Sequence, residues 1–143
     1  MKLMSVMAGA VALALVASSA SAQERISLSA GFLPDPVAIE VYSGGPQNAS
    51  SLGGSCVGAI ASNPDVVVNF NSVGGVLSFT FQSNGDTSLV INGPDGRYYC
   101  NDDTNGLDPV LTWRNAPSGQ YDVWIGAVGA PAGGTLLISE SPL

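Results

Sequence analysis

The stretch Asp86–Asp103, DTSLVINGPDGRYYCNDD, predicts a β-hairpin. Two runs rich in apolar and aromatic residues, TSLVIN and RYYC, flank the four residues GPDG. Proline in the second position and glycine in the fourth are favourable for a β-turn. A tight turn between two such runs joins antiparallel strands, so this stretch favours an all-β fold.

The turn also predicts which residues face each other across the hairpin. If the first and last glycines of GPDG pair, Leu89 faces Cys100 and Asp86 faces Asp103. Side chains alternate between the two faces of a strand, so a disulfide at Cys100 would point inward. The residues expected on the core side are Leu89, Ile91, Tyr98 and Cys100.

The rest of the chain after residue 22 has the pattern of strands and turns. Short apolar runs are separated by clusters of Gly, Pro, Asn, Asp and Ser, and no run has helical spacing. This predicts one antiparallel β-sandwich or jelly-roll domain over residues 23–143, without a parallel strand pair, because no helix provides a crossover. The Gly-rich segment 44–55 is expected to be a mobile surface loop. The expected strands are residues 25–30, 37–43, 56–60, 65–70, 76–82, 87–92, 97–100, 110–114, 120–127 and 135–140.

Residues 1–22 are expected to be a cleaved signal peptide. Lys2 precedes an apolar run, and Ala20-Ser21-Ala22 supplies the small residues of a cleavage site. The alternative is a retained membrane anchor, for which the apolar run is short. We expect a secreted or periplasmic protein with no membrane span after cleavage.

Charge and composition exclude several classes of function. After cleavage, three arginines remain against 11 acidic residues, which gives a net charge of −8. Such a surface repels phosphate backbones, so no nucleic-acid partner is expected. The chain has no histidine and, once cleaved, no lysine, which excludes His-dependent triads and Ser-Lys chemistry. We therefore do not expect an enzyme.

Cys56 and Cys100 are the two cysteines of the chain. In an oxidising compartment, two cysteines by default form one disulfide. A zinc site is not favoured because two cysteines without histidine lack the usual ligand set.

Acidic and amide side chains gather around the open end of the predicted hairpin. Like charges directly opposite each other destabilise a strand pair, so Asp86 and Asp103 need a neutralising partner. A calcium ion takes six to eight oxygen ligands from carboxylates, amides and carbonyls, and would serve. The candidate ligands are Asp86, Asn101, Asp102, Asp103 and Asp108.

Two other interpretations of these residues stay open. Asp and Asn are common in turns, so the loop could be solvated, with Asn105-Gly106 as its turn. The spacing is not that of an EF-hand, and a bulge in the hairpin would change the register. A carboxylate-based hydrolase is also conceivable, but its two acids should lie across a substrate groove.

Exposed aromatic side chains suggest a sugar- or polymer-binding surface, with packing inside the sandwich as the alternative. The candidates are Trp124, Tyr99 and Tyr121. In YDVWIGA, Tyr121 shares a side with Val123 and Ile125, whereas Asp122 marks the side of Trp124 as the wetter one.

The motifs DTSLVINGPDG, CNDDTNGLDPVL and SGQYDVWIGA resemble the bacterial pre-peptidase C-terminal (PPC) domain family, over about residues 65–140. The resemblance implies a secreted, non-catalytic jelly-roll module with a binding or structural role. Some relatives bind calcium or contact a polymeric substrate, and Asp86, Asn101, Asp102 and Asp103 fall on the acidic part of the family pattern. The chain shows no peptidase domain, so the partner, a protein or a polysaccharide, stays open.

Overall fold

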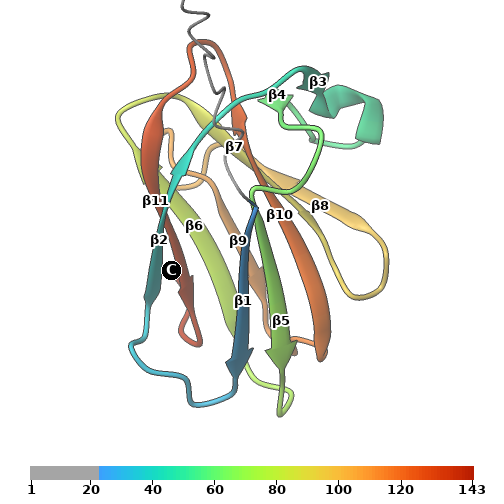
Figure 1. Ribbon diagram of the computed structural model, residues 1–143, viewed down its shortest axis with the longest axis vertical. Helices are drawn as coiled ribbons and strands as arrows, with labels where there is room; N and C mark the ends of the chain where they lie inside the picture. The colour runs from blue at the N-terminus through green and yellow to red at the C-terminus, as the bar shows by residue number, and fades with distance from the viewer. Residues whose placement is uncertain (1–22) are drawn as a thin grey trace, which may run out of the picture.

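The computed structural model describes residues 23–143, and the expected signal peptide lies outside the described residues. These residues form an all-β sandwich of two sheets (Figure 1). No helix among them is long and apolar enough to span a membrane. The seven-stranded sheet contains β1 (Glu24–Ser29), β3 (Gln47–Asn48), β4 (Ala59–Ile60), β5 (Val66–Asn71), β7 (Thr87–Asn92), β8 (Tyr98–Asn101) and β10 (Gly119–Ala127). The four-stranded sheet contains β2 (Val37–Tyr42), β6 (Leu77–Ser83), β9 (Val110–Trp113) and β11 (Gly133–Ser139).

Alternating apolar residues explain why these strands form a sandwich. On β10, Tyr121, Val123 and Ile125 point to one side and are fully buried. They belong to the main core between the sheets, together with Phe79 and Phe81 of β6. The opposite side of each strand forms the outer face of its sheet, and on β10 this side carries Gln120, Asp122 and Trp124.

One strand pair departs from the expected antiparallel arrangement. β1 pairs with β5 in parallel, from Glu24 opposite Val66 to Ser29 opposite Asn71. A parallel pair needs a crossover connection, and the sequence offered no helix for one. In this sandwich the chain crosses through β2 of the other sheet and returns by way of β3 and β4.

The predicted register of the β7–β8 hairpin is wrong by one residue. Val90, and not Leu89, lies opposite Cys100. The backbone N–H of Gly93 donates to the carbonyl of Arg97 at 2.9 Å, so the loop holds three residues instead of two. Gly96 has a φ of 77°, the left-handed conformation that such a loop with a bulge requires.

This shift turns the side chains of β8 to the other face. Cys100 and Tyr98 point to the outer face of the seven-stranded sheet, and Tyr99 points toward the core side. The disulfide between Cys56 and Cys100 is confirmed, with its Cα atoms 5.0 Å apart, but it lies outside the main core. It joins a second cluster whose buried residues are Ala49, Cys56, Ile60, Val90 and Trp124.

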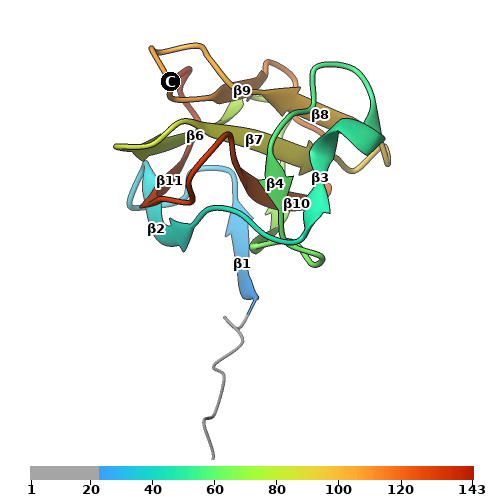
Figure 2. The same cartoon turned by 90° about the horizontal axis from the view of Figure 1, so that it is seen from above.

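The segment 44–55, expected to be a mobile loop, has regular structure. It contains β3 and a 3-10 helix, η1 (Ala49–Leu52), which the sequence pattern did not predict. The side chain of Asn48 caps this helix by accepting a hydrogen bond from the N–H of Ser50 at 3.0 Å. Figure 2 shows β3 and η1 on the side of the seven-stranded sheet that faces away from β2, β6 and β11. The disulfide therefore pins this segment over the outer face.

Candidate functional site

The acidic loop after β8 is braced by its own side chains. Asn101 Oδ1 accepts hydrogen bonds from Thr104 Oγ1 at 2.8 Å and from the N–H of Val110 at 2.9 Å. Asn105 and Asp108 form an isolated bridge with two backbone hydrogen bonds of 3.1 Å. These contacts are those of the structural-loop interpretation, but the turn lies at Gly106-Leu107, one residue after the expected Asn105-Gly106.

Asp86 and Asp103 are not paired across the hairpin, because the β7–β8 ladder ends at Asn101. Partial desolvation, followed by the charges of Asp102 and Asp86, raises the pKa of Asp103 above its usual value. Within residues 23–143, no three acidic, cysteine or histidine residues are placed to hold a metal ion together. Calcium binding by Asp86, Asn101, Asp102, Asp103 and Asp108 stays a prediction.

The three aromatic candidates lie on two different faces. Tyr121 is fully buried in the main core, where its hydroxyl donates to the carbonyl of Pro117 at 2.7 Å. Tyr99 is half-buried and donates to Asp95 Oδ2 at 2.5 Å. This hydrogen bond raises the pKa of Tyr99 and lowers the pKa of Asp95. Both tyrosines pack with Trp113 on the core side of the sheet, Tyr121 inside the main core and Tyr99 at its partly exposed edge, so only Trp124 of the three lies on the outer face.

Trp124 lies under the pinned segment and is 9% exposed. Its ring centroid is 6.1 Å from that of Tyr98, and the two planes are tilted by 44°. Tyr98 is 44% exposed, so this pair presents an aromatic edge to solvent. Tyr98 was not among the predicted site residues, because the expected register placed it in the core.

A recess opens between this aromatic pair and the pinned segment. Its volume is about 240 Å³. Gln47 Nε2 donates to Ser62 Oγ at 3.4 Å across one part of its rim. The buried indole N–H of Trp124 has no hydrogen-bond partner within the part of the chain that the structure describes. The residues that line the recess are Gln47, Asn48, Ser51, Leu52, Ile60, Ala61, Ser62, Tyr98 and Trp124.

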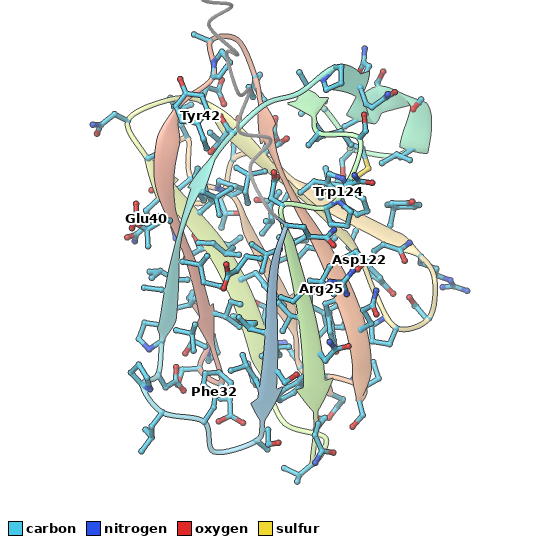
Figure 3. All side chains as sticks on the ribbon, viewed as in Figure 1. Arg25, Phe32, Glu40, Tyr42, Asp122 and Trp124 are labelled. Carbon is cyan, nitrogen blue, oxygen red and sulfur yellow. A yellow bond between two sulfur atoms is a disulfide. The ribbon has the colours of Figure 1, made fainter. Side chains whose placement is uncertain are left out.

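A second, larger cleft of about 410 Å³ opens between β1, β2 and the connection from β4 to β5. Glu24, Glu40 and Asp65 line it together with the exposed Tyr42. Figure 3 labels Glu40 and Tyr42. Burial raises the pKa of Asp65 to about 6, although Asp65 Oδ2 accepts a hydrogen bond from the N–H of Ile125 at 2.8 Å. These carboxylates are not the acids that the sequence analysis singled out.

Comparison with known proteins found similar solved structures but no matching family. No protein-family model matches the chain, and no curated protein does. One similar solved structure is the pre-peptidase C-terminal domain of collagenase from Bacillus anthracis, with 16% identity, coverage of 82% of this chain and 93% of that chain, and a TM-score of 0.46. Another is PliG from Aeromonas hydrophila, a periplasmic inhibitor of g-type lysozyme, with 10% identity, coverage of 82% and 98%, and a TM-score of 0.35. A PPC domain, the family that the sequence resembles, is thus among the solved structures similar to this fold.

Proposed function

We propose that this protein is a secreted, non-catalytic module that binds a neutral saccharide in the recess beside Trp124. The observation that carries the proposal is the composition of the recess: one aromatic pair and four amide or hydroxyl side chains share a single concave surface. Ligand sites commonly combine apolar and aromatic walls with a few polar groups that fix orientation.

The chemistry of the recess fits a sugar. The exposed ring of Tyr98 offers a rigid amphipathic surface, which suits the apolar CH faces of a sugar ring, and the nearly buried Trp124 packs against it. The side chains of Gln47, Asn48, Ser51 and Ser62 can both donate and accept hydrogen bonds, as sugar hydroxyls do. None of the described residues that line the recess is charged, and the whole chain carries a net charge of −7. A neutral ligand therefore fits better than a phosphate or a carboxylate.

A binding role fits this chemistry better than catalysis. A carboxylate hydrolase needs two acids placed across its substrate groove, and the described lining of the recess includes no acid. The disulfide suits an oxidising compartment, which supports a secreted or periplasmic location.

The test is calorimetric titration of the oxidised protein with neutral cello-, xylo- and chito-oligosaccharides. We expect one of these ligand series to bind, and the Tyr98→Ala variant to bind it at least about tenfold more weakly. Tyr42→Ala is the matched control, because Tyr42 is 68% exposed on β2 and does not line the recess. Binding that Tyr98→Ala and Tyr42→Ala weaken equally would place the site elsewhere.

We also propose that a calcium ion stabilises the acidic loop. The specific support is that Asp86 Oδ1 and Thr87 Oγ1 are buried and without hydrogen-bond partners among the described residues. Such atoms call for a ligand or an ordered water. Specific binding to the folded state must raise the melting temperature as calcium is added after EDTA treatment. A flat response up to millimolar calcium, or an equal response of Asp86→Asn, contradicts this proposal.

A further inference from the structure

Small polar side chains gather again farther along the outer face of the seven-stranded sheet, beyond Arg25, Val67 and Asp122. At the far end of β1, β5 and β10 these side chains border a shallow hollow of about 320 Å³. Figure 1 shows the three strands side by side. The outward-pointing side chains that border the hollow are Ser27, Ser29, Asn69, Asn71, Ser118 and Gln120.

The strand register sets these side chains next to one another. Asn69 of β5 lies opposite Ser27 of β1 on one side and opposite Gln120 of β10 on the other. Two residues nearer to the recess, Val67 of β5 lies opposite Arg25 of β1 on one side and opposite Asp122 of β10 on the other. Neighbouring side chains on one face of a sheet are close enough to contact the same ligand.

The hollow and the recess share one face of β10. Trp124, Asp122 and Gln120 point to this face in succession, and four residues of a strand span about 13 Å. Figure 3 shows Trp124, Asp122 and Arg25 on this side of the molecule. The side chain of Gln120 is oriented along this line, because its Nε2 donates to Asp122 Oδ1 at 2.8 Å.

We infer that the ligand is a chain of neutral sugar units that runs from the recess to the hollow along β10, an inference that rests on the proposed function. The amide and hydroxyl groups of the hollow match the donors and acceptors of successive sugar units. Between the recess and the hollow, the sheet carries one positive side chain, Arg25, and one negative side chain, Asp122. Because these charges balance, this part of the surface does not attract a charged polymer. A single extended neutral polysaccharide would therefore occupy both the recess and the hollow.

The inference predicts a dependence of affinity on chain length. In calorimetric titrations, the hexasaccharide of the ligand series should bind more tightly than the disaccharide. Asn69→Ala and Gln120→Ala should each weaken hexasaccharide binding by about fivefold, the usual effect of one lost hydrogen bond. Neither should change disaccharide binding. Both side chains are exposed, so neither substitution disturbs the core.

The matched control is Gln82→Ala, because Gln82 is an exposed glutamine on β6 of the opposite sheet. Equal affinity for both chain lengths, or equal effects of Gln120→Ala and Gln82→Ala, overturns the inference. The recess would then hold one or two sugar units alone, and the proposed function would stand. If no oligosaccharide of any length binds, the proposed function and this inference fail together.

Discussion

Replacing Asp65 with asparagine is expected to stabilise the folded protein at neutral pH. Asp65 directly precedes β5, and its side chain is partly buried in the cleft between β1 and β2. Burial raises its pKa from 3.8 to about 6, so the folded state holds the proton more tightly than the unfolded state. An asparagine keeps an oxygen that can accept the hydrogen bond from the N–H of Ile125, and it carries no charge.

The sign and the size follow from proton linkage. A carboxyl with a raised pKa contributes its stability below the unfolded pKa near 3.8, and this contribution is lost as the pH rises through about 6. Two units of pKa correspond to roughly 3 kcal/mol as an upper bound. Because Asp65 is partly exposed, solvent screening reduces the expected loss to about 1–2 kcal/mol.

The assay is urea unfolding of the wild type and of Asp65→Asn at several pH values between 4 and 8. The variant should gain stability relative to the wild type as the pH rises, reaching about 1–2 kcal/mol at pH 7. Glu24→Gln removes the same charge from an exposed position that lines the same cleft. A stability difference that does not change with pH, or that Glu24→Gln reproduces, would show that the buried charge of Asp65 does not destabilise the folded state.

Three further perturbations probe the packing beside the recess and the hairpin turn. Gly126→Ala should lower stability by about 1–3 kcal/mol, because the added Cβ would overlap Ser88 Oγ, and an unchanged melting temperature would contradict this close packing. The disulfide closes a loop of 44 residues, so its reduction should lower the free energy of unfolding in urea by about 4 kcal/mol. Reduction should also expose Trp124, which would shift its fluorescence to the red. The same unfolding midpoint before and after reduction would contradict this. Asp95→Asn should lower the pKa of Tyr99 toward its ordinary value, measured by alkaline titration of tyrosine absorbance, and an unaltered titration would disprove the hydrogen bond.

Most of the fold could be predicted from the alternation of apolar residues and the turn residues between them. The predicted strand at residues 120–127 agrees with β10, and Tyr121, Val123 and Ile125 face the core as expected. The parallel pairing of β1 with β5 could not be predicted, because it depends on a crossover through the opposite sheet.

The turn sequence alone does not determine the register of the β7–β8 hairpin. GPDG fits a two-residue turn and also a three-residue loop with Gly96 in the left-handed conformation. The choice between them moves Cys100 and Tyr98 from the core to the outer face.

For the same reason, only part of the candidate site could be found from the sequence. Trp124 was correctly placed on the side of the strand away from the main core. The small polar residues of segment 44–55 predicted a mobile loop. In the structure, the disulfide instead holds this segment above Trp124.

The most direct test of the account is the side-chain indole N–H signal of Trp124 in a nuclear magnetic resonance titration with a neutral oligosaccharide. The chain has two tryptophans, so Trp113, which packs against the main core, is the internal reference. A Trp124→Phe variant assigns the two signals. If the saccharide binds beside Trp124, the Trp124 signal shifts with ligand concentration while the Trp113 signal stays in place. A titration that moves neither signal, or only that of Trp113, would contradict a saccharide site beside Trp124.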